Sequence, residues 1–414
     1  MATALVALVA LAALGASAGC GSDDSSGGPV ALKFYVAPEG SGSFENASET
    51  CTKQADGRYR VTIAPLPADA GAQREQLVRR LAAKDDDIDI IGMDVIWTAE
   101  FAEAGWVKPW TGELEREVRR GTLPATLETA TYQDKLWAAP GNTNAQLLWY
   151  RKDRVKTPPK TWDEMFQMAR KLGKDGLIEA QGGQKEALAV WFNTLVNSAG
   201  GSVLKGQDEP GLGAPAEKAA AIIGRLANGP WTDPSLSNQR EDENRLAWES
   251  GAPSFMVNYS FVYPSAKENA PEVFKNMAWA PYPSVEAGKP AKVSIGGFNL
   301  GVGAYSKHPK ESFEAAACMR SAENQRFAAD KGGLPPTLQS LYDSPAFAKA
   351  NPFSKVLLQT IKDSSVRPVS PVYNDISLAI QKTLSPPGSV KDPAATAEKL
   401  KQRVADALVS KGLL

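Results

Sequence analysis

Histidine and cysteine are scarce in this sequence. Its 414 residues include one histidine, His308, and three cysteines. This scarcity nearly excludes metal sites with several His or Cys ligands, His-based catalytic triads and cysteine clusters. We expect neither a metal nor a cofactor, and the first question is whether the chain is an enzyme at all.

An excess of positive charge is also missing. Lys and Arg number 46 against 47 Asp and Glu, a formal net charge of −1, and no basic block interrupts the chain. Nucleic acid is therefore not an expected partner, because binding it needs a basic surface. What the chain does have is length, 43% hydrophobic residues, and 10 Trp, 10 Tyr and 13 Phe. The length favours two folded domains, and the aromatic residues suit a flat-faced polar ligand.

The start of the chain indicates secretion. Residues 1–19 form an uncharged run of Ala, Leu and Val, too short for a convincing membrane span, and Cys20 follows at once. Residues 17–20 resemble a bacterial lipobox, which would make Cys20 a lipidated first residue, although Ser17 departs from the motif. An ordinary signal peptide with an unmodified Cys20 is the alternative. Residues 20–29 read as a flexible tether, so we expect a protein held by lipid alone at the extracytoplasmic face of the membrane.

Cys51 and Cys318 are the cysteines that remain. In an oxidising compartment they are expected to be paired, although two free, buried thiols are the alternative. Because they lie far apart in the sequence, a bond between them requires discontinuous domains.

The order of apolar patterns is typical of an α/β fold. Strand, helix and strand patterns follow one another over residues 30–36 and 58–66, 73–84, and 87–95. A strand at LLWY then precedes a helix that Thr161 and Glu164 cap, with Met165 and Phe166 on its buried face. Further strand-like segments cover residues 253–263 and 292–306, and helices are expected over 308–332 and at the C-terminal end.

Several of these segments are similar to one protein family. The similar segments are DVIWTAEFAEAGWVKPW, NTNAQLLWYRKDRV followed by PPKTWDEM, VWFNTLVNSAGGSVL, APYPSVEAGKPAKVSIGGFNLGV and VRPVSPVY. They resemble the extracellular solute-binding proteins of ABC importers, in the carbohydrate family of maltose- and trehalose-binding proteins, and most closely the mycobacterial-type trehalose-binding lipoproteins. The chain is shorter than those lipoproteins between VNYSFVY and APYPS.

The resemblance implies an α/β fold of two discontinuous lobes, the type II periplasmic-binding-protein fold, with the ligand in a cleft at the hinge. It places residues 30–145 and 292–345 in lobe 1, and residues 146–291 and 346–414 in lobe 2. The implied function is that of a monomeric binding protein, not an enzyme, which closes on a disaccharide such as trehalose or maltose and delivers it to the membrane permease.

A sugar offers hydroxyl groups around a ring and two weakly polar faces, so its site needs carboxylates, amides and an aromatic plate. Asp94 ends a buried strand where open α/β sheets bind ligands, although it could instead cap the following helical segment. Asn142 and Asn144 lie at the expected hinge, and a plain turn is the alternative for Asn142. The resemblance implies an acidic ligand contact for Glu39, with an ordinary surface-turn glutamate as the alternative, and a weaker polar contact for Gln73.

In the second half, the resemblance implies sugar contacts for Trp191, Asn193, Glu241 and Tyr259, with Tyr259 as the preferred stacking plate; Trp191 could equally belong to the core. Gly296 and Gly297 would let the backbone approach a ligand, and they are also compatible with a β-bulge. Arg367 would bridge sugar oxygens or pair with a binding carboxylate, unless it is an ordinary surface residue.

Two other functions stay open at this level. A secreted α-glucoside hydrolase could use Asp94 and Glu241 as paired carboxylates, although no hydrolase motif is present. A binder of a modified sugar or of a sugar-glycerol conjugate would be favoured if Arg367 pointed into the cleft without a partner.

Overall fold

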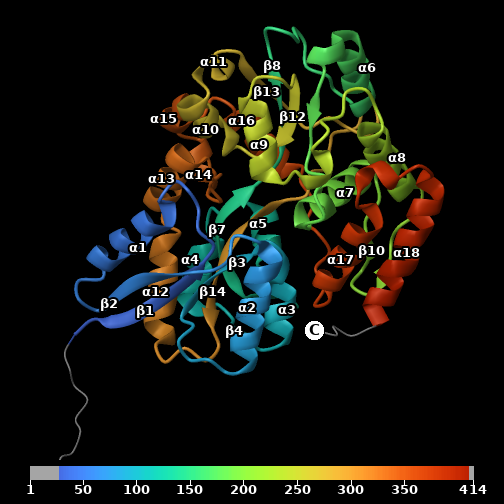
Figure 1. Ribbon diagram of the computed structural model, residues 1–414. Coiled ribbons are helices and arrows are strands. Elements are labelled where there is room, and N and C mark those ends of the chain that lie inside the picture. Colours follow the sequence, from blue (N-terminus) through green and yellow to red (C-terminus); the bar gives the residue numbers. More distant parts are fainter. Residues whose placement is uncertain (1–27, 410–414) are drawn as a thin grey trace, which may run out of the picture.

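The computed structural model describes residues 28–409. The expected signal peptide over residues 1–19, Cys20 and most of the tether lie outside this range. The described chain folds into two α/β lobes, drawn at the lower left and at the upper right of Figure 1. No helix within residues 28–409 is long and apolar enough to cross a membrane.

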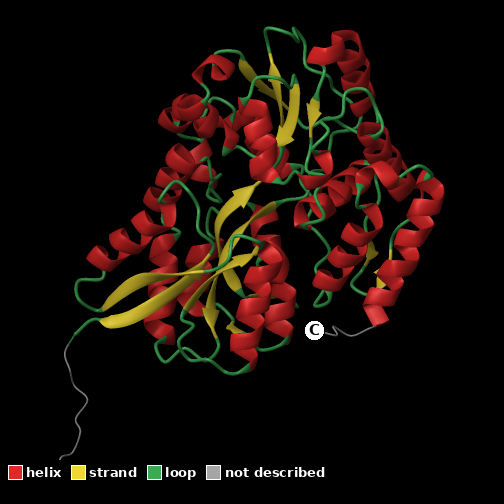
Figure 2. Ribbon diagram, viewed as in Figure 1, coloured by secondary structure: helices red, strands yellow, loops and turns green. Residues whose placement is uncertain are grey.

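The first lobe is built on a mixed sheet in the order β2-β1-β3-β14-β4, with β7 also paired to β14. β1 runs parallel to β2 and β3, whereas β14 is antiparallel to β3, β4 and β7. Helices pack around this sheet (Figure 2). The elements are β1 (Val30–Val36), α1 (Ser43–Gln54), β2 (Tyr59–Pro65), α2 (Ala70–Ala82), β3 (Ile90–Asp94), α3 (Thr98–Glu103), β4 (Val107–Lys108), α4 (Gly112–Arg119), α5 (Pro124–Thr129), β5 (Thr131–Tyr132), β6 (Lys135–Leu136), β7 (Ala138–Asn144), β14 (Gly296–Gly303), α12 (Pro309–Met319) and α13 (Ala322–Gly332).

The second lobe has a smaller sheet in the order β13-β8-β12-β9 and a larger share of helices. Its elements are β8 (Leu147–Arg151), α6 (Trp162–Leu172), β9 (Ile178–Glu179), α7 (Glu186–Ser198), β10 (Leu204–Lys205), β11 (Glu209–Pro210), α8 (Ala214–Ala227), α9 (Glu241–Glu249), β12 (Phe255–Asn258), α10 (Val262–Asn269), α11 (Pro271–Phe274), β13 (Met277–Ala280), α14 (Gln339–Tyr342), α15 (Pro345–Ala350), α16 (Ser354–Lys362), α17 (Tyr373–Leu384) and α18 (Pro393–Val409).

Each lobe has its own apolar core, and the chain passes between the lobes more than once. One large cluster gathers residues from β1 to β7 with others from β14 and α12, and another gathers residues from β8 to β13 with α16, α17 and α18. The chain crosses from β7 into β8 and returns from β13 into β14. The lobes are therefore discontinuous in sequence, while the exact boundaries expected from the sequence stay a prediction.

Local sequence signals explain where the best-defined helices start. The Thr161 side chain accepts a hydrogen bond from the Glu164 backbone N–H at 3.1 Å, and the Glu164 carboxylate accepts one from the Lys160 N–H at 2.7 Å. Both bonds satisfy N–H groups that would otherwise lack a partner at the start of α6. Met165 and Phe166 are buried on the inner face of this helix, as the apolar pattern predicted.

The strand expected over residues 253–263 is wrong in its second half. β12 ends at Asn258, and α10 begins at Val262. The Asn258 side chain accepts a hydrogen bond from the Tyr259 backbone N–H at 2.8 Å, which turns the chain out of the sheet. The short connection therefore carries Tyr259 away from the core of the lobe.

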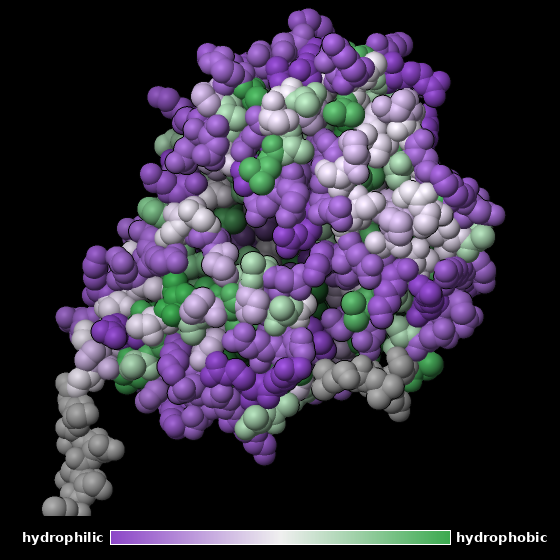
Figure 3. All heavy atoms as spheres, in the orientation of Figure 1, coloured by the Kyte–Doolittle hydropathy of each residue, from purple (hydrophilic) through white to green (hydrophobic). Residues whose placement is uncertain are grey.

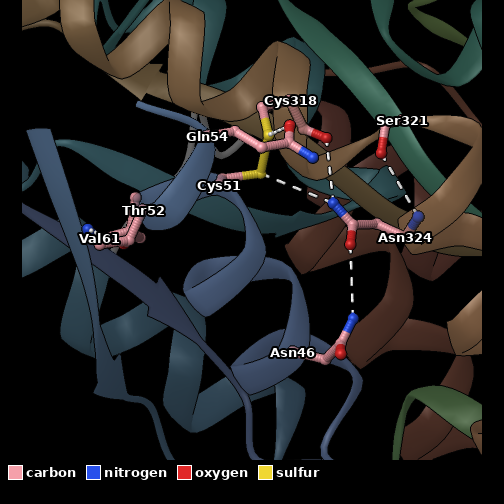
Figure 4. The surroundings of a disulfide bond; sticks show 8 residues. All are labelled: Asn46, Cys51, Thr52, Gln54, Val61, Cys318, Ser321 and Asn324. Atoms are coloured by element: carbon pink, nitrogen blue, oxygen red, sulfur yellow. Dashed lines mark hydrogen bonds between the residues drawn. A yellow bond between two sulfur atoms is a disulfide. The ribbon is translucent and has the colours of Figure 1, made fainter. Parts of the chain in front are cut away.

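A disulfide bond joins Cys51 of α1 to Cys318 of α12, as predicted for two cysteines in an expected oxidising compartment. The two residues are 267 positions apart in the sequence, and the free-thiol alternative is excluded. Figure 4 shows the bond between the two helices, where the Asn324 side chain donates to the Cys318 carbonyl oxygen at 3.2 Å. The bond ties the early and late segments of the first lobe together.

A carboxyl group lies fully inside the second lobe. The Glu179 side chain on β9 is buried, and the side chains of Asp233 and Gln239 interact with it. Burial, reinforced by the charge of nearby Asp233, raises the pKa of Glu179 to about 8. Glu179 is therefore protonated in the folded protein at neutral pH.

We expect this carboxyl group to make stability fall as pH rises. Because the folded pKa of Glu179 exceeds the unfolded value, the folded state holds the extra proton between about pH 4.5 and pH 8. Replacing Glu179 with the neutral Gln should stabilise the protein near pH 8.5 by roughly 2–4 kcal/mol and change little near pH 5. Urea unfolding of both proteins at the two pH values tests this expectation, with the exposed Glu209→Gln as the control. Equal gains at both pH values would contradict it.

Candidate functional site

A cleft of about 1080 Å³ is lined by residues of both lobes. Figure 3 shows the surface hollowed between the upper and lower parts of the molecule. The first lobe contributes the turn after β1, the start of α2 and the end of β3, and the second lobe contributes the starts of α7 and α9 and the segment after β12. Nine of the predicted site residues line the cleft: Glu39, Gln73, Asp94, Asn144, Glu241, Tyr259, Gly296, Gly297 and Arg367.

Asp94 lies at the end of β3, where the apolar strand Ile90–Asp94 leaves the sheet. Its Oδ1 accepts a hydrogen bond from the Ile96 backbone N–H at 3.2 Å and lies 3.4 Å from Nη2 of Arg367. The side chain is 21% exposed. Burial raises the pKa of Asp94, and Arg367 opposes that rise. The sequence allowed two roles for Asp94, a cap of the following turn and a position in the cleft, and the residue has both.

Arg367 is held by two carboxylates. Its Nη1 donates to Oε1 of Glu186 at 2.6 Å in addition to the contact with Asp94. Burial disfavours the charged guanidinium, but Asp94, followed by Tyr373 and Glu186, outweighs this and raises the pKa of Arg367. Glu186 also accepts hydrogen bonds from Tyr373 at 2.7 Å and from Ser377. The arginine is thus fixed in the cleft as one half of an ion-pair network.

Glu241 and Tyr259 bring a carboxylate and an aromatic ring from the second lobe. Glu241 is the first residue of α9, and it forms no ion pair within the described chain. Burial raises the pKa of Glu241, and burial together with the charge of Glu241 raises the pKa of the Tyr259 hydroxyl. The ring therefore lies in acidic surroundings. Further aromatic side chains line the same cleft: Trp97, Phe261, Phe298 and Tyr373.

Asn144, Gly296 and Gly297 lie where β7 pairs with β14. Gly296 is opposite Asn144 and Gly297 is opposite Thr143 in the register of these strands. Gly297 has φ +130°, and a Cβ there would lie 2.3 Å from the Asn142 carbonyl oxygen, so only glycine fits. The strand pairing is irregular just after it, between Phe298 and Asn299. The glycine pair itself keeps regular register with β7, so the irregularity expected at these two residues lies one residue further along, and both glycines line the cleft.

Glu39 and Gln73 line the cleft but are bound by local backbone groups. Glu39 accepts hydrogen bonds from the N–H groups of Ser41, at 2.8 Å, and Ser43. Gln73 is buried, and its Nε2 donates to the Ala68 carbonyl oxygen at 3.3 Å. Its Oε1 has no partner within residues 28–409. The Glu39 oxygens and the Gln73 Nε2 are therefore less free for a ligand than the Asn144 amide.

Three predicted site residues lie outside the cleft lining: Asn142, Trp191 and Asn193. Asn142 is buried, and its Oδ1 accepts the Phe298 N–H at 3.2 Å, which holds the irregular strand pair. Trp191 is fully buried with its ring 6.1 Å from that of Trp162. The Asn193 amide donates to the Ala189 carbonyl oxygen at 2.8 Å. Trp191 and Asn193 are structural because α7 is buried along almost its whole length, and Asn142 is structural because it holds β7 against β14.

Several charged residues of the cleft were missed from the sequence. Glu186 is the main one, and no motif marks it; its only signal is an acidic residue at the start of a long apolar helix. Lys185 Nζ lies 3.0 Å from Oδ2 of Asp69, the residue that caps α2. This ion pair joins the two lobes across the cleft. Arg74 and Glu100 form a further pair on the first-lobe side.

The chain is similar in sequence to known binding proteins. The family model for bacterial extracellular solute-binding protein matches residues 45–326. A probable ABC transporter-binding protein from Deinococcus radiodurans is 27% identical over 387 residues, covering 86% of this chain and 88% of the relative.

Two solved structures share the fold. The maltose-bound MalE3 of T. maritima has a TM-score of 0.82 at 24% identity, covering 92% of this chain and 99% of that one. A solute-binding protein from Thermotoga lettingae, bound with α-D-tagatose, has a TM-score of 0.80 at 20% identity, covering 92% and 100%. The two-lobed α/β architecture is thus that of periplasmic binding proteins.

Proposed function

This chain belongs to the bacterial extracellular solute-binding proteins, and we propose that its cleft binds a disaccharide such as trehalose or maltose for an ABC importer. The observation that carries the proposal is the content of the cleft. Carboxylates of Asp94 and Glu241, the free amide of Asn144 and the ring of Tyr259 line one space between two lobes. Those are the groups that hydroxyls and a sugar face require.

The strength of such a site can be bounded. A hydrogen bond to a charged group contributes about 1.5–3 kcal/mol. Three or four of them with one stacked ring give roughly 6–8 kcal/mol, which corresponds to a dissociation constant of about 1–40 micromolar. Affinity of this order suits capture from dilute solution followed by release to a permease.

The pairing of Arg367 argues against a modified, acidic sugar as the ligand of the cleft. An anionic ligand would be expected to pair with the most buried cation of the cleft, but that cation, Arg367, is already in contact with both Asp94 and Glu186. A neutral sugar needs only that the carboxylates and the guanidinium hold their positions. The sugar-glycerol conjugate differs from a disaccharide at one ring only, and a ligand panel separates the two.

The hydrolase alternative is weaker on this geometry. Its two carboxylates, Asp94 and Glu241, do line the same cleft. However, Asp94 caps the turn after β3 and is in contact with Arg367. A nucleophile or base would have to leave both partners, whereas a binding residue gains from being fixed. The family to which the chain belongs consists of binding proteins.

In the proposed cycle the two lobes close on the sugar, and the closed form delivers it to the permease. We further propose that the protein works as a monomer and is held at the extracytoplasmic face of the membrane by lipid on Cys20. Mass measurement of the mature protein tests the anchor, because an unmodified Cys20 or cleavage elsewhere would contradict it.

The ion pair between Lys185 and Asp69 should help hold the lobes closed. Both side chains are partly exposed, 50% and 33%, so the pair is expected to contribute less than about 1 kcal/mol. Lys185→Met should therefore raise the dissociation constant of the sugar by about twofold to fivefold, mainly through faster release.

Stopped-flow release measurements test this, with Lys289→Met as the matched control, because Lys289 pairs with Glu286 outside the cleft. High salt should speed sugar release from the wild-type protein, because it screens the ion pair. It should not speed release from Lys185→Met, which lacks the pair. Equal release rates for the wild type and Lys185→Met would remove the pair from the closing mechanism.

A further inference from the structure

A second cavity, of about 620 Å³, lies in the first lobe and shares no lining residue with the cleft. It is bordered by the ends of α1 and α4 and by the junction of α12 and α13. Three of its lining residues, Gln54, Cys318 and Ser321, are seen around the disulfide in Figure 4. Nothing in the proposed sugar cycle uses this cavity.

Arg320 lines this cavity as a buried cation with no carboxylate partner. The residue is only 5% exposed. Its Nε donates to the Pro140 carbonyl oxygen at 3.2 Å and its Nη2 to the Thr122 hydroxyl at 2.7 Å, and both acceptors are neutral. Nη1 donates to no group of the described chain. Burial lowers the pKa of Arg320 to about 10, against the opposing charge of Glu117, so the guanidinium stays charged at neutral pH. A buried charge is normally in direct contact with a countercharge, and Arg320 forms no ion pair within residues 28–409.

Two further features add positive potential to the same cavity. Arg120 lines it and forms no ion pair within residues 28–409. The eleven-residue helix α13 starts there, with Ser321 as its cap and Ala322 as its first residue. The first N–H groups of a helix lack intrahelical acceptors and favour an anion.

The acidic residues around the cavity offset this charge only in part. Glu314 is engaged by Arg58, with which it forms an ion pair at the rim. Glu117 is exposed and forms no ion pair in the described chain, although its charge acts on Arg320. Among the lining residues, three guanidinium groups, of Arg58, Arg120 and Arg320, stand against two carboxylates, of Glu117 and Glu314. The charge of the lining is therefore positive.

We propose that this cavity binds a small oxyanion, with Arg320 and Arg120 as its cationic ligands and the start of α13 as a backbone donor. A tetrahedral oxyanion such as phosphate or sulfate, or a carboxylate, offers the acceptor oxygens that guanidinium N–H groups take in pairs. The anion would supply the countercharge that Arg320 lacks.

Isothermal titration of the folded soluble domain with sodium phosphate, sodium sulfate and sodium acetate tests the proposal, against sodium chloride of equal ionic strength. We expect saturable binding of at least one oxyanion, and the order among the three identifies the preferred class. Arg120→Ala should weaken that binding about tenfold, as expected for one charge-assisted hydrogen bond. Arg320→Gln should weaken it at least as much.

The controls separate this cavity from the rest of the protein. Arg326 lies on α13, pairs with Asp330 and does not line the cavity. The variant Arg326→Ala should therefore bind the anion as the wild type does. Asp94→Ala should also leave anion binding unchanged, and Arg120→Ala should leave sugar binding unchanged. If Arg320→Gln does not fold, Arg120→Ala decides alone. Absence of saturable binding for all three anions, or full binding by Arg120→Ala, would overturn the proposal.

Discussion

Replacing Asp94 with Ala is expected to weaken sugar binding at least about a hundredfold, because at least two charge-assisted hydrogen bonds to the ligand are lost. The same change removes one of the two carboxylates that hold Arg367, so the guanidinium is left with Glu186 alone. Stability should fall by only about 1 kcal/mol, the usual cost of a lost cap. Isothermal titration with trehalose or maltose measures the affinity, and thermal unfolding measures the stability.

Two further variants show whether the effect belongs to the site. Asp94→Asn keeps an oxygen to accept the Ile96 N–H but lacks the charge, so its stability should be nearer to wild type while binding stays weak. Asp85→Ala removes a carboxylate that pairs with Arg80 in the same lobe, outside the cleft, and should bind sugar normally. Unchanged affinity in Asp94→Ala would remove this residue from the site.

The largest expected effect on stability comes from the disulfide. A bond that closes a loop of 267 residues restricts the unfolded chain strongly. The double variant Cys51→Ala, Cys318→Ala should therefore lose about 2–5 kcal/mol of unfolding free energy. Thermal and urea unfolding of the variant and the wild type, without reductant, measure the loss.

Reductant supplies the internal control for that experiment. Dithiothreitol should lower the unfolding temperature of the wild type toward that of the double variant and leave the double variant unchanged. Equal stability of the oxidised wild type and the double variant would show that the bond contributes nothing to the fold. Sugar affinity should change little, since neither cysteine lines the cleft.

The fold was predictable because its signals are local or compositional. Apolar periodicity located β3 and α6, and the Thr161 cap located the start of α6. The disulfide followed from having two cysteines in a secreted chain. The strand over residues 253–263 failed in its second half because a short apolar run does not show where the chain leaves a sheet.

The residues alone placed a candidate site residue only where it ends a recognisable element, as Asp94 ends a buried strand. Tyr259 was expected inside a strand, and only the family resemblance placed it at the ligand. Trp191 could not be resolved, because a helix that is apolar on all sides does not reveal which side faces a cleft. Glu186 was missed because its partner Arg367 lies 181 residues away, and sequence spacing carries no information on such a contact.

The claim that the cleft binds a disaccharide without cleaving it is tested most directly by equilibrium binding of a small sugar panel to the soluble domain, followed by recovery of the ligand. The panel should contain trehalose, maltose, a monosaccharide, a polyol and a sugar-glycerol conjugate, and isothermal titration should be repeated with Asp94→Ala. We predict saturable binding of a disaccharide near micromolar concentration, loss of that binding in Asp94→Ala, and recovery of the intact disaccharide afterwards. Binding of no sugar on the panel, or release of glucose from the disaccharide, would contradict it.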